Sequence, residues 1–151
     1  MKFKLKKGPR QRWIDALRSG KFKQGYAALA GDVKGGTPGC YCVLGVATEL
    51  YRRSISPRPQ WQEYTDAFNV FGLGLPYEAQ EYLGVGDDFD DVRLNLSDLT
   101  PETFRAIDDA VLGATGNRNF RWDSAWLSAL NDIRVPFGLL ADVIEQCTEA
   151  A

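Results

Sequence analysis

The sequence predicts a mostly helical α+β fold, built as a single compact domain with a small antiparallel β-hairpin near residues 26–44. Two observations support this class. Apolar side chains recur at helical spacing in several segments, most clearly in 9–19 and 101–113. Glycine-rich sequence separates two short β-prone segments, and 151 residues suit one domain with its own hydrophobic core. We therefore expect no domain boundary.

The chain opens with a strongly basic segment in which Phe3 and Leu5 alternate with lysines. This pattern is compatible with an edge strand, a flexible arm or a phosphate-contacting tail. We expect residues 1–8 to be a solvated, flexible arm. A helix should follow over 9–19, because its apolar residues share one face and Gly20 provides a stop.

The predicted hairpin pairs a weak strand at 26–30 with a second strand at 40–44, joined by the glycine-rich loop 31–39. The loop lacks the Gly-Lys-Ser/Thr ending of a phosphate-cradling P-loop, so a nucleotide triphosphatase has little support. The second strand runs into the stretch Cys-Tyr-Cys-Val-Leu-Gly-Val, around which we expect the chain to be organised.

Gly45 should mark a tight turn from this strand into a helix at 44–53. Arg52 and Arg53 suit the C-terminal end of that helix, where its dipole favours cations. A helix N-terminus can also present N–H groups to an anion. Close packing of backbone against backbone is the explanation that we prefer for the glycine.

Short helices joined by turns are expected in the second half. Thr100 as N-cap and Pro101 at the first helical position make the clearest helix start. We place this helix at 101–113, ended by Gly113, and the others at 77–83, after Asp123 as a cap, and from about 136 onward. The predicted buried residues are Trp13, Ile14, Leu17, Cys42, Leu44, Val46, Leu50, Leu83, Phe104, Ile107, Val111, Trp126, Leu127, Leu130, Phe137, Leu140 and Ile144.

Composition excludes several chemistries. Without any histidine, Ser-His-Asp and Cys-His relays and histidine-ligated metal centres are impossible. The three cysteines Cys40, Cys42 and Cys147 have no zinc-site spacing and are expected to be free thiols. The acidic run at 87–91 lacks the EF-hand pattern and suggests a solvated loop. We expect no metal and no cofactor.

The two halves of the chain carry opposite charge. Residues 1–60 contain 13 Lys and Arg against 3 Asp and Glu, whereas residues 61–151 contain 5 against 17. This favours packing of one half on the other, and a homo-oligomer formed by head-to-tail contact between copies. The sequence shows no long apolar run and no signal peptide, so we expect a soluble, cytoplasmic protein without a membrane partner.

Four short motifs spread along the chain resemble one family. They are Trp-x-x-Ala-Leu-x-Ser-Gly-Lys-Phe-Lys-Gln-Gly at 13–25, Cys-x-Leu-Gly-Val at 42–46, Leu-Pro-x-x-Ala-Gln-x-x-Leu-Gly at 75–84, and Leu-Asn-Asp at 130–132 before a closing Phe-x-x-Leu-Ala-Asp-x-Ile helix. The family consists of small, uncharacterised proteins of tailed bacteriophages and actinobacterial genomes. The resemblance implies a phage or prophage origin and no particular activity. Val43 stands where the family often has a second cysteine, which favours packing over chemistry at Cys42.

The resemblance and the local patterns together select a set of candidate ligand-binding residues: Lys23, Gln24, Gly25, Cys42, Gly45, Asn131 and Asp132. Asn131 and Asp132 should lie at a helix end, where such residues commonly cap or bond local backbone. The functional alternative is that both lie beside Gln24 and the Gly45 turn and form a small polar pocket. No catalytic residue is assigned.

We favour a phage-encoded, non-enzymatic binding protein that holds a host protein or a small, phosphate-bearing signalling molecule, as an antagonist of a host factor or host defence. The side chains expected to meet phosphate are Arg12, Arg18, Lys21, Lys23 and Arg52. A virion or assembly component, or a nucleic-acid-associated protein, is the alternative. An enzyme with Cys42 as nucleophile and Asp132 or Lys23 as base is opposed by the missing histidine.

Overall fold

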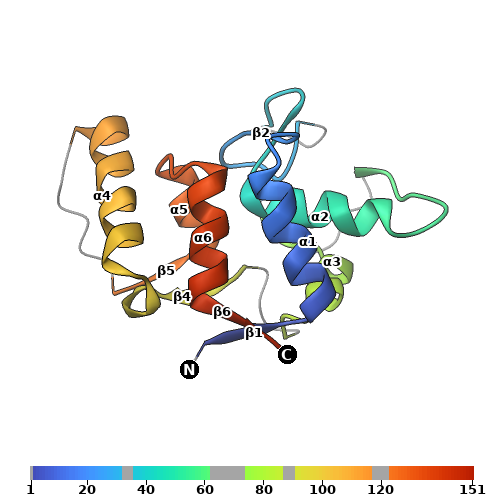
Figure 1. The fold of residues 1–151 in the computed structure, drawn as a ribbon. Helices are drawn as coiled ribbons and strands as arrows, with labels where there is room; N and C mark the ends of the chain where they lie inside the picture. Colours follow the sequence, from blue (N-terminus) through green and yellow to red (C-terminus); the bar gives the residue numbers. More distant parts are fainter. Residues whose placement is uncertain (1, 32–35, 62–73, 87–90, 117–122) are drawn as a thin grey trace.

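The computed structural model describes residues 2–31, 36–61, 74–86, 91–116 and 123–151, and it confirms the mostly helical α+β class (Figure 1). Its elements, in chain order, are β1 (Phe3–Leu5), α1 (Lys7–Arg18), β2 (Lys23–Gln24), β3 (Cys40–Tyr41), α2 (Val43–Arg53), α3 (Tyr77–Leu83), β4 (Arg93–Asn95), the 3₁₀ helix η2 (Leu96–Asp98), α4 (Pro101–Thr115), β5 (Ser124–Trp126), α5 (Leu127–Asp132), α6 (Phe137–Cys147) and β6 (Thr148–Ala150). Among the described residues, the strands form three separate two-stranded sheets.

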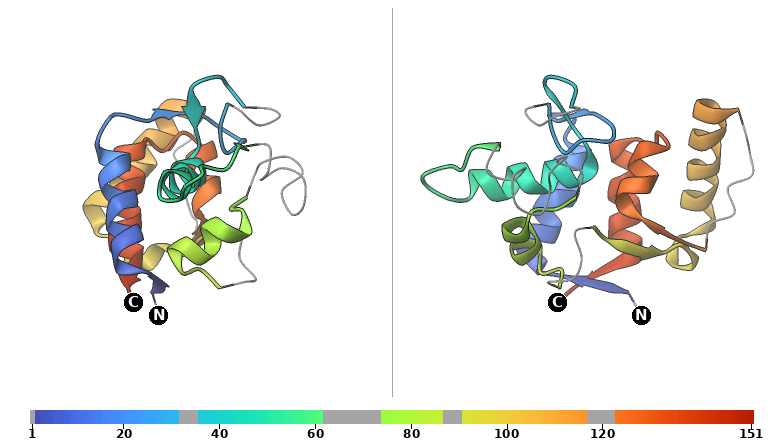
Figure 2. Two further views of the ribbon diagram at one scale, coloured as in Figure 1. Left: turned by 90° about the vertical axis from the view of Figure 1, so that its right-hand side faces the viewer. Right: turned by 180° about the vertical axis from the view of Figure 1, so that it is seen from behind.

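Helix α6 lies at the centre and packs against α1, α4 and α5, while α2 packs against α1, α3 and α5 (Figures 1 and 2). Most of the predicted core residues are buried. Leu50 and Phe104 are only partly buried and pack against the core. Trp126 is also only partly buried, and the guanidinium of Arg93 lies over its ring at 5.0 Å from the centroid.

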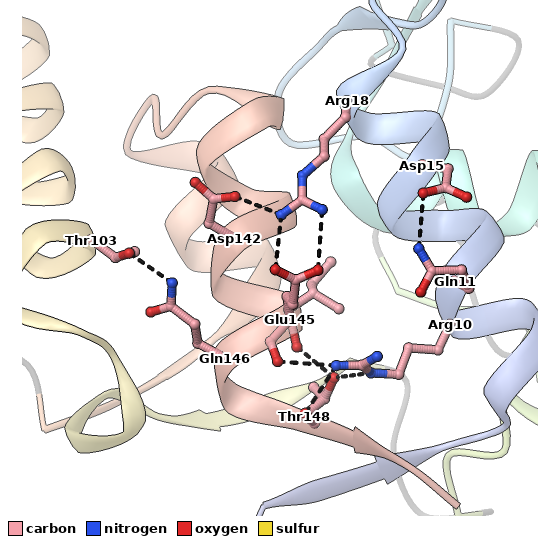
Figure 3. A network of polar contacts seen from close by, with 10 residues as sticks. Arg10, Gln11, Asp15, Arg18, Thr103, Asp142, Glu145, Gln146 and Thr148 are labelled. Atoms are coloured by element: carbon pink, nitrogen blue, oxygen red, sulfur yellow. Dashed lines mark hydrogen bonds and ion pairs between the residues drawn. The ribbon is translucent and has the colours of Figure 1, made fainter.

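Polar contacts join α1 to α6, as the opposite charges of the two halves predict (Figure 3). Arg18 contacts Asp142 at 2.6 Å and Glu145 at 3.1 Å, and these carboxylates raise the pKa of Arg18 while Arg18 lowers the pKa of Glu145. About two turns earlier in α1, Arg10 donates to the hydroxyl of Thr148 at 2.9 Å. Because Arg18 and its partners are largely solvated, these contacts orient the two helices more than they stabilise them.

Residues 3–5 at the basic opening are a strand and not a free arm. In the parallel pair of β1 and β6, Phe3 lies opposite Thr148 and Leu5 opposite Ala150. The N–H of Ala151 donates to the carbonyl oxygen of Leu5 at 2.7 Å, and Leu5 is completely buried. The edge-strand alternative therefore describes this segment, since burying Leu5 requires its backbone polar groups to be paired.

The position of the predicted hairpin is wrong. Strand β2 pairs with β3 in parallel, and only an isolated bridge joins Ala30 to Tyr41 in the antiparallel sense. The extended run breaks at Ala27, whose φ of 70° turns the chain. The antiparallel pair is instead β4 with β5, from two regions far apart in sequence.

Three predicted helix boundaries are also corrected. Helix α2 begins at Val43 with Cys42 as its N-cap, so Gly45 lies inside the first turn. Helix α4 continues past Gly113 to Gly116, where φ is 74°. The residues after Asp123 form β5, and the next helix starts at Leu127. Most of the predicted acidic loop at 87–91, and parts of the predicted loop at 31–39, lie outside the described residues.

Candidate functional site

Gln24 and Asn131 come together, as in the alternative that placed Asn131 beside Gln24, although 107 positions separate them. The side-chain amide of Gln24 donates to the Asn131 oxygen at 3.0 Å and to the carbonyl oxygen of Val135 at 2.8 Å. The Gln24 oxygen accepts from the N–H of Phe137 at 3.2 Å. Asn131, which is fully buried, donates to the carbonyl oxygen of Gly25 at 3.0 Å. We call this set, with Val43 and Asp132, the Asn131 network.

The N-terminus of α2 is part of the same network. The N–H of Val43 donates to the Asn131 oxygen at 3.1 Å, and the N–H of Gly45 donates to the Cys42 sulfur at 3.4 Å. The first turn is also fixed from α1, because the indole N–H of Trp13 donates to the Val43 carbonyl at 3.0 Å. These N–H groups, which would otherwise attract an anion, already have acceptors within the protein.

Close packing explains Gly45. A Cβ atom at this position would lie 1.6 Å from the carbonyl oxygen of Leu29. That oxygen accepts a hydrogen bond from the N–H of Cys42 at 3.1 Å, so the strand-like segment around Leu29 is held directly against the first turn of α2. Only a residue without a side chain permits this approach. The preferred interpretation of the glycine agrees with this geometry.

Asp132 stabilises an unusual backbone conformation. Its carboxylate accepts from the N–H of Ala27 at 2.9 Å and from the side-chain amide of Asn131 at 3.3 Å. Ala27 has a positive φ, which is unfavourable for a residue with a Cβ atom. Asp132 itself is exposed. Its contacts connect the end of α5 to the turn that follows β2.

Cys42 is poorly suited to nucleophilic chemistry. Its side chain is buried, and this burial raises the pKa of the thiol to about 12. Lys23, the other candidate partner, is exposed on β2 next to Gln24, and successive side chains of a strand point to opposite sides. The geometry therefore favours a structural role for the Asn131 network, while ligand binding by the seven candidate residues stays a prediction.

The arginines expected to meet phosphate have partners within the protein. Arg12 donates to the hydroxyl of Tyr82 at 3.1 Å, and Arg18 contacts the two carboxylates of α6. Arg52 is buried, pairs with Glu49 and lies 5.1 Å from the ring centroid of Trp61. Because carboxylates already neutralise Arg18 and Arg52, these two are weak candidates for an anion site.

A different region carries an open groove of about 760 Å³. Its described lining residues come from three strands and their flanks: Lys2, Phe3 and Lys4 around β1, Arg93, Leu94 and Asn95 of β4, and Asp123 and Ser124 at the start of β5. We call it the β1–β4 groove. Three of its side chains are cationic and one is a carboxylate. Figure 1 shows β1, β4 and β5 in the lower part of the molecule, near the lower ends of α4 and α6.

Comparison with protein families matches residues 1–148 to a family described as a domain of unknown function, DUF8296. The chain belongs to the DUF8296 family. Neither the curated proteins nor the solved structures contain a match to it. The DUF8296 match includes both the Asn131 network and the β1–β4 groove, and it supports the predicted resemblance to an uncharacterised family.

In the DUF8296 chain, no helix among the described residues is both long enough and apolar enough to cross a membrane. The described ranges also contain no cluster of three or more cysteine and acidic side chains placed to hold a metal ion. Asp91, from the predicted acidic loop, accepts from the backbone N–H and the hydroxyl of Ser128 at the start of α5. At Asp91 the carboxylate therefore serves as a helix cap.

The sequence reasoning missed the groove, although signals for its walls were present. Residues 92–96 read Val-Arg-Leu-Asn-Leu, a strict alternation of apolar and polar residues that predicts a half-buried strand. The same alternation occurs in the opening segment, where Phe3 and Leu5 alternate with lysines. No pattern within either segment indicates that the two strands line the same groove, because their juxtaposition depends on tertiary packing.

Proposed function

We propose that this chain is a non-enzymatic binding protein, encoded by a phage or prophage, and that it holds a host protein in the β1–β4 groove. The observation that supports this most is the composition of the groove walls. Cationic side chains from Lys2, Lys4 and Arg93 line the groove together with the partly exposed apolar side chain of Phe3. A groove of about 760 Å³ lies within the size range of known binding sites.

The chemistry of the described residues supports binding over catalysis. The chain has no histidine, and burial raises the pKa of both Cys42 and Cys147, to about 12 and about 11. Within the groove, the hydroxyl of Ser124 accepts from Arg93 at 2.7 Å, so its neighbour is a cation and not a base. A nucleophile needs a base to remove its proton, and Arg93 cannot serve as one.

A protein partner fits the groove better than a small signalling molecule does. The walls are formed by short strands at the surface, and the site is open along its length. Small ligands are usually enclosed, with most of their surface buried. Strand-lined surface grooves of this kind commonly receive extended polypeptide.

Site-specific photo-crosslinking in an actinobacterial host tests this proposal. Benzoylphenylalanine in place of Phe3 should give an adduct with one host protein, identified by mass spectrometry. The same probe in place of Tyr77, which is exposed on α3 and does not line the groove, is the matched control and should give none.

The variant carrying Lys2→Glu, Lys4→Glu and Arg93→Glu should lose the adduct at Phe3. Incubation of the purified partner with the wild-type chain should leave the partner's mass unchanged, since no reaction is expected. Equal adducts at both probe positions, no adduct at Phe3, or a covalently altered partner would each contradict the proposal.

A further inference from the structure

We propose that the β1–β4 groove binds an acidic, extended polypeptide segment by strand addition to the free edge of β1. The inference rests on the proposed function and names the chemistry of the partner segment. It is carried by three features of the described residues: the course of the groove, the direction of backbone groups in β1, and the charge of the walls.

The groove runs along the edge of β1. Successive side chains of a strand point to opposite faces. The groove nevertheless touches the consecutive β1 residues Phe3 and Lys4, while its other wall is formed by 93–95 of β4 and by Ser124 of the paired strand β5. Contact with both faces of a strand places the groove at its edge. None of the lining residues belongs to β6, so the groove lies on the side of β1 away from its partner.

Backbone groups of β1 are available on that side. In a parallel pair, alternate residues direct both N–H and C=O toward the partner strand. The bond from the Ala151 N–H to the Leu5 oxygen identifies Leu5, and with it Phe3, as the residues directed toward β6. Lys4 therefore directs its N–H and C=O away from β6. Within the described part of the chain, β1 pairs with β6 alone.

The positive charge of the groove favours an acidic polypeptide segment. Among the described lining residues, Lys2, Lys4 and Arg93 are cationic and Asp123 is the one carboxylate. The ion pair between Lys4 and Glu149 is long, at 3.9 Å, and both side chains are about half exposed, so Lys4 can turn to another carboxylate. An added strand with acidic residues at alternate positions would meet these cations. Its remaining positions would meet the partly exposed apolar side chain of Phe3.

Backbone-methylated peptides provide the sharpest test. A short fluorescent peptide of alternating Glu and Val should bind the wild-type chain, as measured by fluorescence anisotropy, and its Lys-Val counterpart should not. Methylation of the N–H groups of one alternating set should weaken binding about tenfold or more, whereas methylation of the other set should have little effect, because only one edge of the peptide faces β1. Equal weakening by both sets, or by neither, would overturn strand addition.

Variants of Lys4 separate backbone pairing from charge. Lys4→Ala removes the cation but keeps the N–H, whereas Lys4→Pro also removes the N–H that faces the groove. Proline is tolerated at an edge-strand position whose N–H does not pair, so β1 should still pair with β6. We expect Lys4→Pro to bind the peptide about tenfold more weakly than Lys4→Ala. Lys7→Ala, which removes an exposed lysine of α1 outside the groove, should bind like the wild type.

The outcomes distinguish this inference from the proposed function. A crosslink from Phe3 to a host protein together with failure of all acidic peptides would overturn strand addition and leave the binding function standing. Absence of both would overturn both. Concentration-dependent dimerisation of the wild-type chain that Lys4→Pro abolishes would overturn the host partner, because a second copy would then be the occupant.

Discussion

The Asn131 network and the β1–β4 groove are both formed by residues far apart in sequence, but their polar groups are used in opposite ways. In the network, the buried amide of Asn131 and the amide of Gln24 bond each other and nearby backbone. In the groove, cations line a space of about 760 Å³, and the N–H and C=O of Lys4 point away from the strand that pairs with β1. The first region holds the fold together, whereas the second has polar groups left for a partner.

This difference shows that convergence of polar residues is not sufficient to identify a binding site. A buried amide must be hydrogen-bonded, and Asn131 satisfies this requirement with partners inside the protein. A ligand-binding site needs polar groups that can form hydrogen bonds or ion pairs with the ligand. Variants in the Asn131 network should therefore change the free energy of unfolding more than variants in the β1–β4 groove.

The largest effect is expected for Gly45→Ala. The added Cβ would lie 1.6 Å from the Leu29 oxygen, so α2 and the segment around Leu29 must separate. We expect a loss of at least about 3 kcal/mol in the free energy of unfolding, measured by urea denaturation. Gly113→Ala is the control: its Cβ meets nothing within 4 Å, and replacing glycine within α4 should stabilise the protein by about 0.5–1 kcal/mol. Equal effects of the two variants would contradict the packing argument.

Asn131→Ala should cost about 3 kcal/mol, because the amide of Gln24, the N–H of Val43 and the carbonyl of Gly25 all lose a partner. Chemical denaturation measures the change. Gln11→Ala, which removes an exposed amide bonded only to Asp15 one turn away, should stay within about 0.5 kcal/mol of the wild type. If Asn131→Ala is equally mild, the network does not support the fold.

Cys42 should make the protein less stable at alkaline pH. Its pKa is raised from 9.0 to about 12 on folding, so the stabilisation is fully present below pH 9 and lost as the pH rises toward 12. The expected slope is about 1.4 kcal/mol per pH unit in this window. Unfolding of the wild type and of Cys42→Ala, followed at several pH values, measures it. Parallel pH profiles for the two proteins would show that Cys42 does not carry the effect.

Asp132→Ala should have a smaller effect, about 1 kcal/mol, since the residue is exposed and mainly accepts from the N–H of Ala27. Ala27→Gly should stabilise the protein by about 1 kcal/mol, because glycine adopts the positive φ without strain. Melting temperatures of the two variants test these opposite signs. A destabilising Ala27→Gly would mean that the methyl group of Ala27 contributes packing that outweighs the strain.

The smallest effect on stability is expected in the groove. Lys4→Ala and Arg93→Ala should each change the free energy of unfolding by less than about 0.5 kcal/mol, because the ion pair of Lys4 is long and solvated and Arg93 is exposed. Thermal denaturation checks this. Losses comparable to that of Asn131→Ala would make the groove part of the structural framework.

Much of the fold could be predicted from local pattern. Thr100 and Pro101 start α4 as expected, and Thr100 accepts from the N–H of Thr103 at 3.2 Å. Helix periodicity also located α1 and α6, and the start and stop signals of Pro76 and Gly84 located α3. The predicted hairpin failed because neither Ala27, with its positive φ, nor the parallel pairing of β2 with β3 has a local signature.

The candidate site was predicted in part for the same reason. Gln24 and Asn131 were selected as a polar pair beside the Gly45 turn, and they lie there. Residue type alone does not reveal whether an amide is bonded to its neighbours or open to a ligand. That depends on the positions of Gly25, Val43 and Val135, which come from other elements.

By itself, the sequence determined the helical segments, most of the buried face of each, the lack of imidazole chemistry and the opposite charge of the two halves. These properties follow from side-chain type and from spacing within one element. Tertiary structure alone decided that the basic opening pairs with the last residues of the chain, and that β4 lies beside it to complete a groove. Two strands that are distant in the sequence pair only where the packing of the helices between them brings their backbones together.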